Sequence, residues 1–107
     1  MNAQTERFFL TGAAGVIEAL RDRPAGVHKG VAVIAHPHPL FGGTMDNKVV
    51  QTLARAFVQS GWETIRFNFR GVGASEGVHD AGQGEALDLV DVVRQVAPQG
   101  ALALAGF

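Results

Sequence analysis

Three stretches with strand character alternate along the chain with two helical patterns, and this alternation constrains the fold most strongly. The stretches cover residues 30–35, 62–69 and 101–105. The first is a continuous apolar run rich in β-branched residues, which is typical of a strand buried on both faces of a parallel sheet. We expect all three strands to be buried. Strands that alternate with helices predict an α/β sheet with right-handed crossovers.

A hairpin is expected before this unit. Residues 7–11 and 16–21 have strand character, and Gly12-Ala13-Ala14-Gly15 between them favours a turn. Residues 22–26, which include a proline and a glycine, then break the pattern. The predicted fold class is therefore α/β, with a mostly parallel sheet, flanking helices and an N-terminal antiparallel hairpin.

The first helix is expected to begin after residue 46. Asp46 would be its N-cap, and Met45 and Val50 would form a hydrophobic staple. Ser60-Gly61 would end it, because glycine suits the left-handed position after a helix. The predicted apolar face contains Val49, Val50, Leu53, Ala56 and Phe57.

The second helix is expected over residues 85–97, before Pro98-Gln99-Gly100. Its predicted solvent-facing stripe contains Asp88, Asp91 and Gln95. Its predicted buried stripe contains Leu87, Val90, Val93 and Ala97.

Composition and charge exclude several classes of protein. The 107 residues correspond to one small domain, and 47% hydrophobic with 18% charged residues is ordinary globular composition. The net charge is -1 and no basic run interleaves with aromatic residues, which argues against a nucleic-acid partner. The chain has no cysteine, which excludes disulfides, cysteine-ligated zinc and a thiol nucleophile.

Neither a membrane segment nor a secretory signal is expected. The longest apolar stretches, residues 31–35 and 101–105, are far shorter than the ~20 residues that a membrane span requires. Glu6 and Arg7 interrupt the region where a secretory signal needs a continuous apolar segment. These features predict a cytoplasmic protein.

Ligands bind at the carboxyl ends of the strands in open α/β sheets, and a stiff loop is predicted there. This loop, residues 36–44, contains two prolines and a glycine pair. Because prolines restrict the backbone, the loop could hold N–H groups at set positions and form an oxyanion hole. Pro37 and Pro39 have no N–H, so the candidate donors are those of His38, Leu40 and Phe41. The alternative is a rigid turn without a catalytic role.

The same loop allows a metal hypothesis, because His36 and His38 could present two imidazoles to one ion. A zinc site needs three or four ligands. The other histidines, His28 and His79, follow no convergent strand end. We therefore predict neither a metal nor a cofactor, and metal-dependent hydrolysis is the least favoured alternative.

A second loop, residues 70–84, is rich in glycine. It differs from a dinucleotide-binding fingerprint, because its third glycine, Gly77, comes one position late and the helix begins several residues further on. Ser75 lacks the Gly-x-Ser-x-Gly turn of a nucleophile, so it is interpreted as an ordinary loop serine. Arg70 is expected to form a structural hydrogen bond or ion pair between loops.

Three segments of the chain carry a resemblance to a known family. They are residues 66–77, residues 82–88 and His36-Pro37-His38-Pro39-Leu40-Phe41-Gly42-Gly43-Thr44-Met45-Asp46-Asn47. With these motifs in this order, the chain resembles a bacterial branch of the α/β-hydrolase superfamily over nearly all 107 residues. The resemblance implies a mostly parallel sheet that carries a Ser-His-Asp triad, which usually acts on ester-like bonds.

The resemblance also implies roles for particular residues. One backbone N–H of the oxyanion hole would come from Leu40 or, as a second choice, His38, and the residue after the nucleophile would supply the other. Gly106-Phe107 would begin the Gly-x-Ser-x-Gly turn. The nucleophile, acid and base are then expected beyond Phe107. Residues 1–107 would be the N-terminal part of a single hydrolase domain, without a triad.

A different hypothesis is a non-catalytic α/β module that associates with itself. The third parallel strand would lie at an edge of the sheet and expose unpaired backbone groups, which favour pairing with another chain. A serine hydrolase that acts on a small ester-like substrate is the favoured hypothesis for the parent protein.

Overall fold

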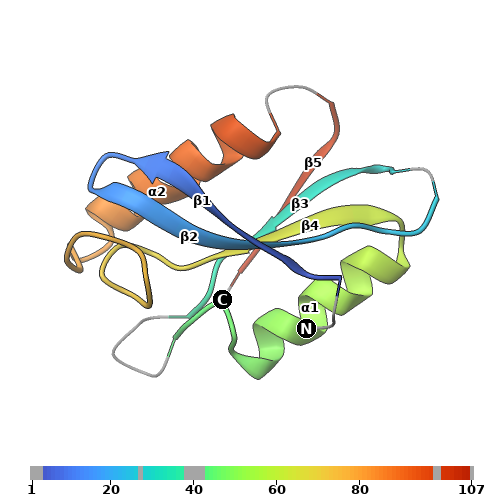
Figure 1. The fold of residues 1–107 in the computed structure, drawn as a ribbon, viewed down its shortest axis with the longest axis horizontal. Helices are drawn as coiled ribbons and strands as arrows, with labels where there is room; N and C mark the ends of the chain where they lie inside the picture. Colours follow the sequence, from blue (N-terminus) through green and yellow to red (C-terminus); the bar gives the residue numbers. More distant parts are fainter. Residues whose placement is uncertain (1–3, 27, 38–42, 98–99, 107) are drawn as a thin grey trace.

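The computed structural model describes residues 4–26, 28–37, 43–97 and 100–106. Within these ranges, five strands and two helices follow the expected order along the chain (Figure 1). They are β1 (Glu6–Gly12), β2 (Gly15–Asp22), β3 (Gly30–Ile34), α1 (Lys48–Gln59), β4 (Trp62–Phe67), α2 (Gln83–Val96) and β5 (Leu102–Ala105). Neither of these two helices is long and apolar enough to cross a membrane.

The strands form one sheet in the order β1-β2-β4-β3-β5. The predicted hairpin is confirmed, since β1 and β2 pair antiparallel from Glu6 opposite Arg21 to Gly12 opposite Gly15. β2 also pairs antiparallel with β4, whereas β3 pairs in parallel with both β4 and β5. The predicted α/β class is confirmed as a mixed sheet, in which three mutually parallel strands are joined to the hairpin.

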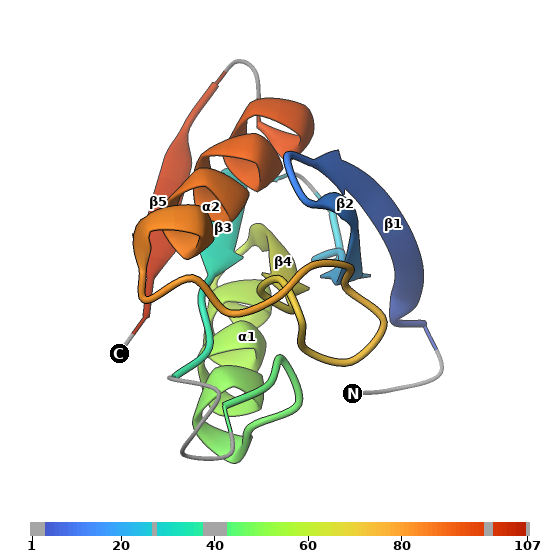
Figure 2. The same cartoon turned by 90° about the vertical axis from the view of Figure 1, so that its left-hand side faces the viewer.

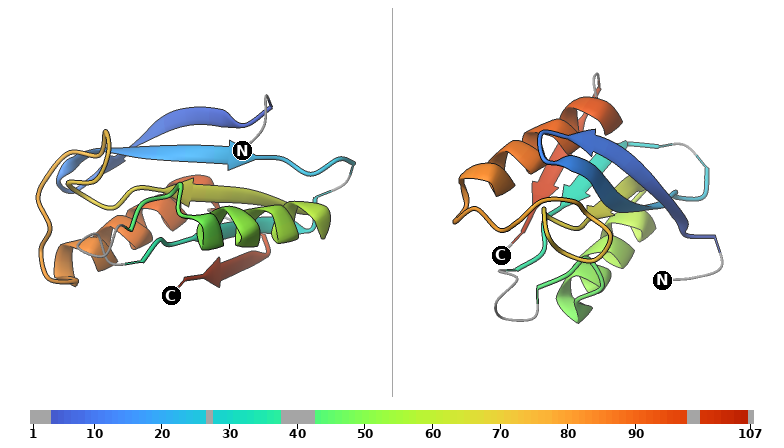
Figure 3. Two further views of the ribbon diagram at one scale, coloured as in Figure 1. Left: turned by 90° about the horizontal axis from the view of Figure 1, so that it is seen from below. Right: turned by 60° about the vertical axis from the view of Figure 1, so that its left-hand side comes forward.

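The two helices cover opposite faces of the sheet (Figures 2 and 3). Successive side chains of a strand point to opposite faces, so Val33 packs in a cluster with Val92 of α2, while Ile34 packs with Val50 of α1. The buried cluster on the α2 face comprises Ile17, Ala19, Val33, Ile65, Phe67 and Val92. The cluster on the α1 face is smaller and comprises Ile34, Val50 and Ala54.

The N-cap of α1 is Asn47, so the prediction of Asp46 was wrong by one residue. The Asn47 side chain accepts hydrogen bonds from the backbone N–H groups of Val49 and Val50, at 2.9 and 3.4 Å. Because the N-cap is Asn47, Met45 and Val50 do not occupy the two positions of a hydrophobic staple, which are those of Asp46 and Gln51. The predicted C-terminal glycine is confirmed, since Gly61 has a φ of 95° directly after the cap residue Ser60.

The predicted apolar face of α1 was partly wrong. Val50 is buried as expected, and Leu53 and Phe57 pack partly buried beside it. The second fully buried residue is Ala54, whereas Val49 and Ala56 are exposed. The helix is therefore rotated toward Val50 and Ala54 relative to the expectation.

The predicted stripes of α2 were partly wrong, because some of its polar residues are buried or bond to other parts of the chain. Gln95 is exposed and Val93 packs against the buried cluster, as predicted. Asp88 is 1% exposed and pairs with Arg70, while Leu87 is 54% exposed. Asp91 Oδ2 accepts a hydrogen bond from the Ala13 N–H at 3.2 Å. Gln95 Nε2 donates to the Thr11 carbonyl at 2.8 Å. The helix thus turns part of its polar side toward the sheet, and the buried apolar residue is Val92.

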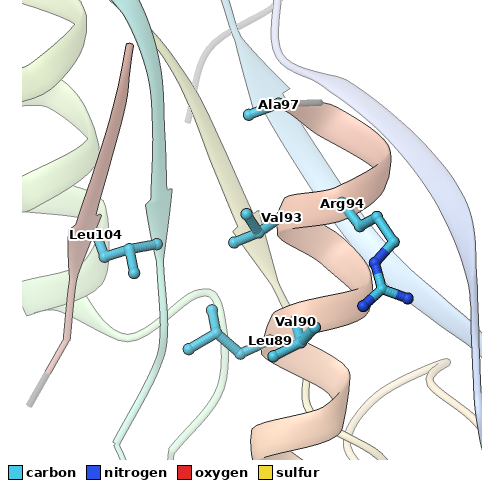
Figure 4. Close-up of a pocket in the computed structure, with 6 residues that line it drawn as sticks. All are labelled: Leu89, Val90, Val93, Arg94, Ala97 and Leu104. Carbon is cyan, nitrogen blue, oxygen red and sulfur yellow. The ribbon is translucent and has the colours of Figure 1, made fainter. Parts of the chain in front are cut away.

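The third parallel strand is less buried than predicted, because β5 lies at the end of the sheet order. Leu104 of β5 is 58% exposed. Its side chain borders an open groove between β5 and α2 (Figure 4). The residues that line the groove are Leu89, Val90, Val93, Arg94, Ala97 and Leu104.

Replacing the cap residue tests where α1 begins. Asn47→Ala removes the acceptor for the Val49 and Val50 N–H groups and should lower the free energy of unfolding by about 1 kcal/mol, measured by urea unfolding. Asn47→Asp keeps the acceptor and should unfold like the unchanged chain. Equal stability of the alanine variant would contradict the assignment of Asn47 as cap.

Candidate functional site

The carboxyl ends of β3, β4 and β5 meet at one edge of the sheet, because these strands are parallel. The Ala35 N–H donates to the Ala105 carbonyl at 2.9 Å. A Cβ atom placed on Gly106 would lie 3.4 Å from the Cβ atom of Ala35. The last described residue therefore lies directly beside the start of the proline-containing loop. This is the position at which open α/β sheets bind ligands.

His36 fixes the start of that loop to the end of β4. The Phe69 N–H donates to His36 Nε2 at 3.0 Å, and His36 Nδ1 lies 2.7 Å from the Pro37 carbonyl. These two contacts require that Nδ1 carries the proton and that Nε2 is unprotonated. The imidazole is 3% exposed, and burial lowers its pKa more than the Pro37 carbonyl raises it.

Both ring nitrogens of His36 are therefore engaged within the chain, which leaves no lone pair for a metal ion. His38, the second ligand of the metal hypothesis, lies outside the described residues. Among the residues that the structure describes, no three or more His, Cys, Asp or Glu side chains are grouped so that they could hold an ion. The geometry around His36 gives metal-dependent hydrolysis no support.

Met45 is held by two side chains of the β4 segment. Its N–H donates to Asn68 Oδ1 at 2.9 Å, and its carbonyl accepts from Arg66 Nη1 at 3.0 Å. Met45 is 3% exposed and Arg66 is fully buried. Sequence reasoning did not identify these contacts. The sequence pattern that could have indicated these contacts is the alternation of apolar and polar residues from Ile65 to Asn68. In a strand this alternation places Arg66 and Asn68 on the face opposite the α2 cluster.

Glu18 of β2 joins this region to the glycine-rich loop. Its Oε1 atom accepts from Asn68 Nδ2 and from the Ala74 N–H, both at 2.8 Å, and its Oε2 atom accepts from Arg7 Nε at 2.8 Å. Burial alone would raise the pKa of Glu18. The hydrogen bonds from Ala74, Arg7 and Asn68 outweigh burial, so the pKa of this carboxyl is lowered and it is ionised at neutral pH.

Arg70 and Ser75 have structural roles, as predicted, although the partner of Arg70 lies on helix α2 and not on another loop. Arg70 bonds to Asp88 through its backbone N–H at 2.9 Å and its Nη2 atom at 3.0 Å, and this contact raises the pKa of the guanidinium. Ser75 Oγ donates to the Asn68 carbonyl at 2.6 Å and accepts from the Glu18 N–H at 2.9 Å. Ser75 is 5% exposed, so its hydroxyl is committed to the loop and is not free to attack a substrate.

The predicted oxyanion donors, Leu40 and His38, lie outside the described residues, as does Phe41. The described residues that flank this segment are Pro37, which follows His36, and Gly43, which lies two residues before Met45. His36 and Met45 are bonded to residues that follow β4, Phe69 and Asn68. The structure thus fixes the two ends between which the predicted donors lie.

The pH dependence of stability tests the state of His36. Because its folded-state pKa lies below the ordinary value, the unfolded chain binds more protons between the two values. The free energy of unfolding should be constant above about pH 7 and should fall as the pH decreases below about 6.5. Urea unfolding at a series of pH values measures this.

His36→Gln is the matched control, because its amide oxygen can accept from the Phe69 N–H without gaining a proton. Glu18 and Glu85 also make stability depend on pH, because their pKa values are lowered from the ordinary 4.5. Their effect on the free energy of unfolding appears in a more acidic range than that of His36. The glutamine variant should therefore lose the decline between about pH 6.5 and about pH 5. The same decline in both proteins would show that His36 is not its source.

No family model matches the chain. An alpha-beta serine hydrolase homologue from Coxiella burnetii is 47% identical, with a TM-score of 0.89, and the match covers 100% of this chain and 52% of that one. An α/β serine hydrolase without a lid from Xanthomonas campestris is 39% identical, with the same TM-score of 0.89 and coverage of 100% and 52%. An uncharacterized protein of Rickettsia prowazekii is 39% identical over 82 residues, which are 77% of this chain and 34% of that protein.

The chain spans about half the length of these two solved relatives and about a third of the Rickettsia protein. The structural agreement nevertheless extends over all of this chain, including the hairpin and the three parallel strands. The predicted resemblance is confirmed at the level of the superfamily. Fold, sequence identity and the arrangement of the strand ends together show that the chain belongs to the α/β-hydrolase superfamily.

Proposed function

We propose that these residues are the N-terminal part of a cytoplasmic serine hydrolase that cleaves a carboxylic-ester or related acyl bond in a small molecule. The main support is the position of the end of β5. Because Ala35 bonds to Ala105, a turn that follows Gly106 would begin beside His36 and the proline-containing loop. Two solved relatives described as serine hydrolases favour the same reaction class.

In the proposed reaction, this chain supplies a backbone donor, and residues after Phe107 supply the nucleophile, acid and base. A serine hydroxyl attacks the ester carbonyl, a histidine takes the hydroxyl proton, and the carbonyl oxygen becomes an oxyanion. The Leu40 N–H, or alternatively the His38 N–H, would donate to this oxyanion together with the residue after the nucleophile. Such donors stabilise charge that develops only in the transition state.

Hydrolysis of p-nitrophenyl acetate tests this proposal. The longer protein from the same reading frame should give a burst of p-nitrophenol followed by steady turnover, because the acyl-enzyme forms before it is hydrolysed. The 107-residue chain should show only the background rate, since it has no activated nucleophile in its described part. Replacing the serine of the proposed turn by alanine is the control. A reading frame without Ser-x-Gly after Phe107 would contradict the proposal.

A second candidate function, association with another copy of this chain, is favoured by the exposed edge of the sheet. β5 is last in the strand order, and its leucines Leu102 and Leu104 are 40% and 58% exposed. The groove beside it is lined mostly by apolar side chains of α2, and Arg94 also borders it (Figure 4). Unpaired edge strands and apolar patches are surfaces on which chains associate. We propose a dimer of the 107-residue chain through β5.

Sedimentation velocity tests the dimer. The chain should sediment as a dimer at micromolar concentration, and Leu104→Lys should convert it to a monomer by placing a charge in the groove. Val78→Lys is the control, since Val78 is an exposed loop residue, 78% accessible, outside the groove. A monomer of the unchanged chain would eliminate this candidate without affecting the hydrolase proposal.

A further inference from the structure

The side-chain amide of Asn68 lies between two loops at the carboxyl edge of the sheet. Its Oδ1 atom accepts from the Met45 N–H at 2.9 Å, and its Nδ2 atom donates to Glu18 Oε1 at 2.8 Å. A backbone N–H can only donate and a carboxylate can only accept, so the amide has one possible orientation. Asn68 is 4% exposed, which leaves both contacts inside the protein.

The same contact reaches the glycine-rich loop through Glu18. Glu18 Oε1 accepts from Asn68 and from the Ala74 N–H at the same distance of 2.8 Å. A Cβ atom on Gly73 would lie 2.5 Å from Asn68 Nδ2 and 2.7 Å from Glu18 Oε1. The backbone of the loop therefore packs directly on the contact between amide and carboxylate. The φ of 54° at Gly73 also favours glycine there.

We propose that Asn68 is a positioning residue, which sets the distance between the loop that ends at Met45 and the loop that contains Ala74. This inference rests on the proposed function, in which the residues shortly before Met45 supply an oxyanion donor. Donors of that kind act only when they are held in place before the reaction, and a displacement of about 1 Å can cost on the order of 100-fold in rate. Asn68 would not touch the substrate.

Asn68→Asp in the longer protein tests the inference, because aspartate has nearly the same shape. The new carboxylate would face the Glu18 carboxylate at hydrogen-bond distance, and two adjacent carboxylates repel unless they share a proton. At about pH 8 kcat should fall on the order of 10- to 100-fold, while KM changes less than about threefold. The ratio of variant to unchanged kcat should rise as the pH decreases, because protonation of the pair restores a donor.

Asn47→Asp is the matched control, since it makes the same chemical change close to Met45 but at the cap of α1. Its kcat ratio should stay near one at every pH. A kcat of Asn68→Asp that equals the unchanged protein, or a loss that does not depend on pH, would overturn the inference. If the aspartate variant does not fold, Asn68→Ser replaces it. Serine adds no charge and is too short to reach both neighbours, so the same fall in kcat is expected and unchanged kcat overturns the inference.

Hydrogen exchange at the Met45 amide separates this inference from the proposed function. In the 107-residue chain the Met45 N–H should be protected, and Asn68→Ser should accelerate its exchange while the amides of α1 remain protected. If the longer protein hydrolyses no ester, the proposed function fails even though this exchange result holds. If ester hydrolysis is present and the Met45 exchange is unchanged by the substitution, the positioning role of Asn68 fails.

Discussion

Charged side chains that are buried on the α1 face of the sheet hold the parts of the chain that surround the candidate site. Glu18 and Asp22 of β2 and Arg66 of β4 are 8%, 4% and 0% exposed. Removing such ions from water costs several kcal/mol each unless hydrogen bonds and opposite charges replace the water. The replacements come from the N-terminal residues Thr5 and Arg7 and from the loop after β4. Desolvation therefore makes each of these segments depend on the same face of the sheet.

The two faces of the sheet consequently differ in which substitutions of buried side chains they tolerate. Where α2 covers the centre of the sheet, the buried contacts are mainly apolar, and apolar packing depends on the volume of the side chains more than on their direction. The α1 face has a smaller apolar cluster and, beside it, the hydrogen-bonded groups Glu18, Arg66 and Asn68. Each of these hydrogen bonds has a defined donor and acceptor, so a change in the direction of one group leaves another unpaired. Arg66 Nη2 lies 3.6 Å from Asp22 Oδ2, a distance that permits charge attraction but is too long for a hydrogen bond. The α1 face is thus the one that specifies geometry near the candidate site.

The positions of the strands and helices could be predicted from the sequence, because they depend on local periodicity. The hydrogen-bond partners of several polar side chains could not be predicted in this way. Asp88 was expected to face solvent because polarity was taken as a measure of exposure, but it pairs with Arg70 and is 1% exposed. Asp46 and Asn47 are adjacent residues of equal capping strength, so pattern alone did not separate them. The sequence did predict that the end of β3, at His36, lies near the end of β5, because parallel strands have their carboxyl ends at the same edge of a sheet. The contact between Glu18 and Asn68 joins residues 50 positions apart, and no local pattern indicates it.

The hydrogen bonds between Gln95 and Thr11 affect where an additional strand can pair with this sheet. Gln95 accepts from the Thr11 N–H at 3.2 Å and donates to the Thr11 carbonyl at 2.8 Å, so its amide occupies both backbone groups of this residue of the outermost strand β1. Asp91 occupies the next N–H along, at Ala13. An additional strand would have to displace these side chains to pair there. Among the described residues, no side chain occupies the backbone of β5 in this way, so the β1 edge is blocked at Thr11 and Ala13 while the β5 edge is open to a further strand.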